Sequence, residues 1–253
     1  MSDVVVVRAA IAPMHAEARV SSVQISQRLG GHALRVLAMD GEWLRARGDD
    51  GYEGWVHRGY VEPADASDLA RTDRRLSLSC VVRASAASPL RPLPLGAWVP
   101  TGDMVVSGYV IEAAARDQVF TRDASAIAAT AVNRFAGTPY QWGGVSPWGA
   151  DCSGLVQTTF WLHGVVLPRD AWQQAETGRD AGADAAHWEA ADLVFFSDRE
   201  DQRITHVGIA LGHSRMVHLA LGRGGYAVER LDARDDSYVA ALMTRFVGAR
   251  RVL

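Results

Sequence analysis

The spacing of apolar residues changes near Asp123, and this change constrains the fold of the 253-residue chain more than any other feature. Before it, short apolar runs are separated by turns rich in glycine, proline and aspartate, which is typical of β-structure. After it, residues 124–136 carry apolar side chains at four-residue spacing and predict an amphipathic helix. A second helix is predicted over residues 152–163, and strand-like runs follow it. This order predicts an α+β domain that is preceded by all-β structure.

The all-β part is interpreted as two small modules. Asp40-Gly41 lies between two apolar runs and predicts a β-hairpin turn. The stretch DDGYEGWVHRGYVEP resembles the end of a bacterial SH3-like module, which we place at residues 1–65. Residues 64–73 are interpreted as a linker. Residues 75–115 are interpreted as a second, degenerate SH3-like β-barrel module.

The strand-like runs of the C-terminal part predict an antiparallel meander, because turn residues separate them at short intervals. The runs are DLVFF, THVGIALG, RMVHLA and YAVERL, and Gly212-His213-Ser214 is the expected turn between the middle two. Side chains alternate between the two faces of a strand, so His206 shares a face with Gly208 and Ala210. His218 takes the corresponding place on the next strand. We therefore expect both histidines on one face, the less apolar one.

Cys152 stands at the first turn of the predicted second helix. The positive field at a helix N-terminus favours the thiolate of a cysteine. A histidine within reach can deprotonate the thiol, and a second polar group can orient that histidine. Cys152, His206 and His218 together therefore predict the catalytic relay of a cysteine peptidase. The other cysteine, Cys80, lies in an apolar strand-like stretch and is expected to be a buried core residue.

Six motifs in the C-terminal part resemble the NlpC/P60 family of papain-like cysteine peptidases. In chain order they are GTPYQWGG, GADCSGLVQ, LPRDAWQQ, ADLVFF, THVGIAL and MVHLA. The resemblance implies a papain-like domain over residues 122–253. It also implies that Cys152 is the nucleophile, that His206 is the general base and acid, and that His218 orients His206. Tyr140 and the backbone amide of Ser153 would then lie at the oxyanion site.

The SH3-like modules and the LPRD segment make the chain similar to the γ-D-glutamyl-L-diamino acid endopeptidases, or dipeptidyl-peptidase VI type. That resemblance implies a murein peptide substrate with a free N-terminal L-Ala, cut after γ-D-Glu during cell-wall recycling. A free ammonium group requires a carboxylate near the cleft. Asp170 is the expected carboxylate, and Glu53 would be a second one, at a cleft between the peptidase domain and the first module. The full set of expected substrate-binding residues is Asp170, Trp142, Glu53, Arg169 and Asp151, with Ser153 beside Trp142 at the D-Glu pocket.

Two positions depart from the family pattern. Ala171 stands where the family often has serine, so one hydroxyl expected to hold a polar group of the substrate is absent. Ala191 replaces a glycine, and we expect that change to be structural. Either substrate preference or affinity is expected to differ as a result of Ala171.

Three other functions fit parts of the pattern. Cys152, His206 and His218 could bind zinc, although no CxxC or HExxH spacing accompanies them. A papain-like amidase or acyltransferase would use the same nucleophile on another amide or ester. A module that only binds wall peptides is the third alternative.

Charge and composition limit the classes of partner that the protein is expected to bind. A net charge of -3 gives no electrostatic argument for binding nucleic acid or an anionic membrane. The apolar run near the N-terminus is shorter than a signal peptide or a membrane span, so we expect a cytoplasmic protein. No cofactor and no metal are expected. The oligomeric state is left open.

Overall fold

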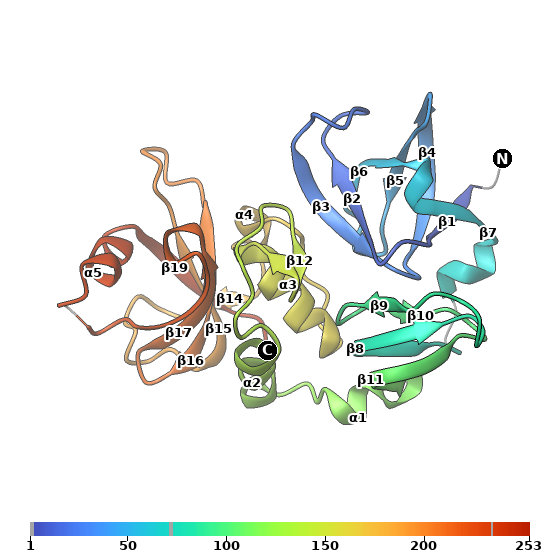
Figure 1. The fold of residues 1–253 in the computed structure, drawn as a ribbon. Coiled ribbons are helices and arrows are strands. Elements are labelled where there is room, and N and C mark those ends of the chain that lie inside the picture. Colours follow the sequence, from blue (N-terminus) through green and yellow to red (C-terminus); the bar gives the residue numbers. More distant parts are fainter. Residues whose placement is uncertain (1–2, 71–72, 234) are drawn as a thin grey trace. The chain divides into compact units, whose positions relative to one another are not determined.

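A computed structural model describes residues 3–70, 73–233 and 235–253. The chain divides into two compact units, with the boundary along the sequence between Val119 and Phe120. Figure 1 shows the helices and strands of both units, and each unit is described separately below. Among the described residues, no helix combines the length and the apolar character needed to cross a membrane.

The first unit begins with a sheet of seven antiparallel strands in the order β3-β2-β6-β5-β4-β1-β7. The strands are β1 (Val4–Val7), β2 (Ile11–His15), β3 (Gln24–Leu29), β4 (Ala33–Asp40), β5 (Trp43–Arg47), β6 (Glu53–His57) and β7 (Val61–Ala64). A short 3-10 turn, η1 (Arg58–Tyr60), joins the last two. The predicted hairpin is confirmed, because β4 and β5 pair on either side of Gly41, whose φ is 53°.

Alternating side chains of these strands form one apolar core. Leu34, Ala46 and Val56 come from three different strands and are completely buried. Residues 5–61 therefore enclose a hydrophobic centre of their own, as an independent β module requires.

The rest of the first unit contains a smaller sheet in the order β10-β8-β11, with β9 paired to β8. Its elements are β8 (Arg75–Arg83), β9 (Arg91–Leu93), β10 (Trp98–Val99) and β11 (Met104–Glu112), preceded by η2 (Ala66–Ala70) and followed by η3 (Ala113–Ala115) and α1 (Arg116–Val119). Cys80 is buried on β8, as predicted. The SH3-like character of this second sheet stays a prediction. Residues 71 and 72 of the predicted linker, and residues 1 and 2 of the predicted first module, lie outside the described residues.

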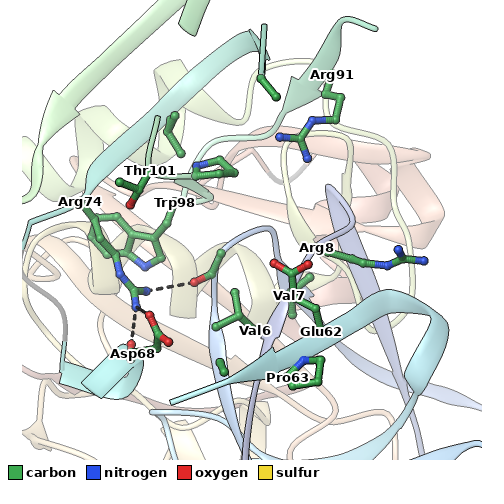
Figure 2. Close-up of a pocket in the computed structure, with 15 residues that line it drawn as sticks. Val6, Val7, Arg8, Glu62, Pro63, Asp68, Arg74, Arg91, Trp98 and Thr101 are labelled. Carbon is green, nitrogen blue, oxygen red and sulfur yellow. Dashed lines mark hydrogen bonds and ion pairs between the residues drawn. The ribbon is translucent and has the colours of Figure 1, made fainter. Parts of the chain in front are cut away.

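The two sheets of the first unit enclose a pocket of about 530 Å³ (Figure 2). The backbone amide of Trp98 donates to the Gly30 carbonyl at 2.8 Å and joins the sheets beside it. Arg74 donates to the Gly31 carbonyl at 3.0 Å, and Arg91 pairs with Asp103. These two arginines of the pocket are thus already bound to oxygen atoms of the protein.

The second unit is α+β, as predicted, with a six-stranded sheet in the order β14-β19-β15-β16-β17-β18. Its helices are α2 (Ala124–Arg134), α3 (Cys152–Leu162), α4 (Ala171–Gln174) and α5 (Ser237–Met243), with a 3-10 turn η4 (Leu221–Arg223). Its strands are β12 (Val145–Ser146), β13 (Gly149–Ala150), β14 (Arg179–Asp180), β15 (Ala190–Phe196), β16 (His206–Gly212), β17 (Arg215–Ala220), β18 (Gly225–Arg230) and β19 (Phe246–Arg251). Helix α2 packs against β15 and β16, and α3 packs against β16 and β17 (Figure 1). Arg234, within the predicted peptidase domain, lies outside the described residues.

The predicted meander is confirmed, because β15, β16, β17 and β18 pair in turn and antiparallel. The predicted turn between β16 and β17 is also confirmed. His213 and Ser214 have φ values of 51° and 54°, which a tight hairpin turn requires. Helix α5 and strand β19 were not predicted.

Candidate active site

Helix α3 begins at Cys152 because the residues around it provide a complete N-terminal cap. Asp151 is the N-cap, and its carboxylate accepts a hydrogen bond of 2.7 Å from the Gly154 amide. The glycine is required here, since a Cβ at Gly154 would overlap the carbonyl oxygen of Gly144. The short segment DCSG thus fixes both the start of the helix and its close contact with the preceding loop.

The thiol of Cys152 is buried, with only 7% of the residue exposed. Backbone amides of Ser153 and Val207 hydrogen-bond its sulfur. Because Val207 directly follows His206, the second of these bonds brings the start of β16 to the thiol. The structure therefore unites the predicted nucleophile with the strand that carries the predicted base.

From the sequence, Cys152 is expected to be a thiolate, but in the structure its thiol is neutral. Burial, and secondarily the neighbouring Asp151 carboxylate, raise the pKa of Cys152 to about 12. The two amides act in the opposite direction, but their effect is smaller. The field of the helix N-terminus is therefore outweighed by desolvation, which the sequence does not reveal, and the resting thiol is neutral.

His206 and His218 meet directly. The distance between His206 Nε2 and His218 Nδ1 is 2.8 Å, which confirms that the two histidines share a face of the sheet. Burial, and then the adjacent His218, lower the pKa of His206 to about 3, so its imidazole is neutral at pH 7. Nε2 is bound to His218, so Nδ1 is the nitrogen of His206 that remains for a proton from the thiol.

The face that carries the histidines lies opposite that of Val207, Ile209 and Val217, and it is buried as well. Ala210 and Met216 lie on it and belong to a buried cluster with Leu242 of α5. His218 itself is completely buried and makes an edge contact with the ring of Tyr238. The cause is α5, which the sequence analysis did not predict.

Tyr140 is held close to the nucleophile by the backbone. It forms a parallel bridge with Ala150, two residues before Cys152. Burial, and then the nearby Cys152 thiol and Asp151, raise the pKa of the Tyr140 hydroxyl. The phenol therefore stays protonated at neutral pH and can donate a hydrogen bond.

Asp151 and Arg169 form a buried ion pair. Arg169 donates to Asp151 Oδ2 at 2.8 Å and to Asp151 Oδ1 at 3.0 Å, and their side chains are 1% and 7% exposed. Arg169 also donates to the Ser153 hydroxyl at 2.8 Å, and that hydroxyl donates to Asp151. These three side chains, predicted to bind substrate, bind one another and support the start of α3.

The other predicted substrate residues of this unit lie nearer the surface. Trp142 is 62% exposed. Asp170 is half-buried at the N-cap position of α4 and makes no capping hydrogen bond. Ala171, the departure from the family pattern, is buried in the first turn of α4. An exposed indole and a partly exposed carboxylate are both accessible to a ligand.

Glu53 lies in the first unit, at the start of β6. It pairs with Arg47 at 2.5 Å and with Arg45 at 2.9 Å on the neighbouring strand. The hydrogen bond from Arg47 lowers the pKa of Glu53, so the carboxylate is ionised. Two guanidinium groups thus already share the charge that was predicted to bind the substrate amine.

One buried carboxylate near the histidines was missed. Glu229 on β18 is 5% exposed and lies 3.4 Å from His218 Nε2. The sequence holds a signal for it. In a hairpin between RMVHLA and YAVERL, Glu229 lies opposite Met216, which shares its face with His218.

A metal at this site would need both imidazoles as ligands, together with the thiolate. The two facing nitrogen atoms of His206 and His218 bond each other. Across the described ranges, no group of three histidine, cysteine or acidic residues is arranged to hold a metal ion.

The reactivity of Cys152 provides a test of its charge state. We expect the rate of alkylation by iodoacetamide to keep rising through about pH 10, above the ordinary thiol pKa of about 8.5. The reason is the pKa of about 12 that burial imposes on Cys152. Alkylation is quenched at set times at each pH, and peptide mapping then measures the rate at Cys152 alone. A plateau near neutral pH would mean that a thiolate is already formed.

Comparison with known proteins agrees with this arrangement. Residues 137–244 match the NlpC/P60 family, and residues 12–62 match the bacterial SH3 domain. A crystal structure of an NlpC/P60 family protein from Bacillus cereus superposes with a TM-score of 0.81. The two chains are 19% identical, and the superposition covers 99% of each, so this likeness shows a shared fold.

Curated relatives match less than half of this chain. The γ-D-glutamyl-L-lysine dipeptidyl-peptidase of Bacillus cereus is 34% identical over 120 residues, which are 47% of this chain and 34% of that protein. The protein of the same name from Bacillus subtilis is 38% identical over 105 residues, 41% of this chain and 34% of that protein. The matched part thus spans about a third of these relatives. This chain combines an NlpC/P60 domain with a bacterial SH3 domain.

Proposed function

We propose that this protein is a cysteine endopeptidase that hydrolyses the γ-D-glutamyl-L-diamino acid bond of murein peptides. The observation that carries the proposal is the relay of Cys152 at the start of α3, His206 beside it and His218 bound to His206 at 2.8 Å. The names of the two Bacillus relatives support the choice of bond.

The reaction begins with the Cys152 thiol and the His206 imidazole both neutral. As the Cys152 sulfur attacks the γ-carbonyl carbon of D-Glu, Nδ1 of His206 takes the thiol proton. Backbone amides at the start of α3 and the Tyr140 hydroxyl stabilise the oxyanion. His206 then gives its proton to the leaving amine of the diamino acid. Water, deprotonated by His206, then attacks the thioester; the Cys152 sulfur leaves, takes back the proton from His206, and L-Ala-γ-D-Glu is released.

The preferred substrate carries a free N-terminal L-Ala, and its ammonium group is bound by carboxylates. Asp170 is the first of these, because it is accessible and follows the buried Arg169 directly. Glu53 is the second, and binding through it requires the ammonium to compete with Arg45 and Arg47. Peptides with a free amine arise when wall fragments are recycled, so the proposal includes a recycling role in the cytoplasm.

Glu53→Gln gives a test of amine recognition. We expect KM for free-amine peptides to rise about threefold to tenfold, with kcat almost unchanged, since the carboxylate shares its charge with two arginines. Glu62→Gln on β7, a distant strand of the same sheet, is the control. Steady-state rates on free and N-acetylated peptides measure the effect. An equal loss on both kinds of peptide would exclude Glu53 from amine recognition.

The proposed bond is tested by a panel of four peptides. L-Ala-γ-D-Glu-L-Lys and L-Ala-γ-D-Glu-meso-diaminopimelate are compared with the α-linked D-Glu peptide and with an N-acetylated γ-linked peptide. Cleavage of the two free γ-linked peptides alone supports the proposal. Cleavage of the acetylated peptide at the same rate would indicate a wall hydrolase without amine selection. No cleavage of any peptide would favour the amidase or acyltransferase alternative.

A further inference from the structure

Glu229 lies directly behind the two histidines. The register of β17 and β18 pairs Glu229 with Met216, two residues before His218, so Glu229 and His218 share a face. Glu229 Oε1 lies 3.4 Å from His218 Nε2, and both side chains are almost fully buried. His218 therefore has a partner on each ring nitrogen: His206 at Nδ1 and Glu229 at Nε2.

Glu229 is held as a carboxylate. Arg223 donates to Glu229 Oε1 at 2.7 Å and to Oε2 at 3.1 Å. The hydrogen bond with His218, and then the bonds with Arg223, lower the pKa of Glu229. An ionised carboxylate can only accept hydrogen bonds. The proton in the contact between Glu229 and His218 must therefore lie on His218 Nε2.

This constraint passes from one ring to the next. A neutral imidazole has one N–H and one lone pair, so a proton on His218 Nε2 leaves His218 Nδ1 as an acceptor. The 2.8 Å contact with His206 then requires the proton on His206 Nε2. His206 Nδ1 is consequently left with its lone pair, in the state that a general base for Cys152 needs.

We propose that Glu229 is a positioning residue that fixes the tautomers of His218 and His206 and so directs the basic nitrogen of His206 to Cys152. The inference rests on the proposed peptidase function for its effect on turnover. The tautomers themselves are a property of the resting protein. The role of a carboxylate behind the second imidazole is the same as that of the aspartate in a Ser-His-Asp triad, which holds the base in the correct tautomer.

The carboxylate is anchored by helix α5. Arg223 also pairs with Asp236 at 2.8 Å, and Asp236 caps α5 by accepting from the amides of Tyr238 and Val239. The Arg223 guanidinium lies over the Tyr238 ring, 4.2 Å from its centroid. Arg223 is thus fixed on both sides, so Glu229 has little freedom to turn away from His218.

Nuclear magnetic resonance of the full chain with ¹⁵N-labelled histidine tests the proposal in the resting protein. We expect the wild type to show a protonated Nε2 and an unprotonated Nδ1 on both His206 and His218 at neutral pH. The signals are assigned from single histidine variants. A proton on Nδ1 of His218 or of His206 would overturn the proposal, whether or not the enzyme cleaves murein peptides.

Glu229→Gln tests the effect on catalysis, because its amide can donate to His218 Nε2 and so favour the opposite tautomers. We expect kcat to fall on the order of 10- to 100-fold with KM changed less than about threefold. Glu189→Gln is the matched control, since Glu189 also pairs with an arginine of this unit but lies at the surface. The control is expected to keep the wild-type rate and tautomers.

The kcat of Glu229→Gln and the tautomers of its histidines together distinguish a positioning role from a structural one. A lower kcat together with mixed tautomers in a protein of wild-type melting temperature supports the proposal. A lower kcat with wild-type tautomers would mean that Glu229 acts only structurally, and would overturn it, as would an unchanged kcat. If the variant does not fold, the tautomers of the wild type still test the proposal. If the wild type cleaves no γ-D-glutamyl peptide, the proposed function fails while the tautomer assignment stands.

Discussion

Cys152→Ala is expected to lower kcat/KM on γ-D-glutamyl peptides by about 10³-fold or more. The reason is that the reaction proposed here passes through a thioester on this sulfur, and alanine cannot form one. The fold should persist, because the cap of α3 is made by the Asp151 carboxylate and the Gly154 amide, not by the thiol. Initial rates on L-Ala-γ-D-Glu-L-Lys, with circular dichroism of the same samples, measure both effects.

Cys80→Ala is the matched control. Cys80 is the other cysteine of the chain, and it is also buried, at 4% exposure. It lies on β8 of the first unit, so its replacement should cost about 1 kcal/mol of stability and leave the rate unchanged. A full rate in Cys152→Ala would remove Cys152 from the mechanism. A large loss of rate in Cys80→Ala would mean that the loss in Cys152→Ala is not specific to the proposed nucleophile.

Asp151→Asn is expected to lower the free energy of unfolding of the second unit by about 3 to 5 kcal/mol. The variant keeps the size of the side chain and an oxygen for the N-cap, but it removes the charge opposite Arg169. The Arg169 side chain is only 1% exposed, so its guanidinium cannot reach water as compensation. Chemical denaturation measures the loss, with the exposure of Cys152 to a thiol reagent as the signal from this unit.

An exposed pair in the same unit is the control for that loss. Arg199 and Asp201 also form a short ion pair, at 2.8 Å, but their side chains are 53% and 55% exposed. Asp201→Asn should therefore leave the free energy of unfolding almost unchanged, because solvent screens an exposed pair. Equal effects of the two substitutions would mean that the buried pair does not stabilise the start of α3.

Much of this site could be predicted from the sequence because the signals are local. Strand alternation placed His206 and His218 on one face, and the 2.8 Å contact between their rings confirms it. The second helix was predicted to begin at Cys152, and α3 begins there. Patterns of a few residues determine such features, and few other parts of the chain can change them.

The parts that could not be predicted depend on burial. The field of a helix N-terminus is visible in the sequence, but the desolvation that raises the pKa of Cys152 is not. Asp151 and Arg169 were predicted to bind substrate, and only the fold reveals that they bind each other. The strand register could place Glu229 on the face of His218, but its burial and its bond with Arg223 of η4 are visible only in the fold.

The most direct test of the central claim is mass spectrometry of L-Ala-γ-D-Glu-L-Lys after incubation with the purified wild type and with Cys152→Ala. We predict that the wild type releases L-Ala-γ-D-Glu and free lysine, and that the variant leaves the peptide intact. The absence of these two products with the wild type, or their equal release by the variant, would contradict the assignment of this relay to γ-D-glutamyl bond hydrolysis.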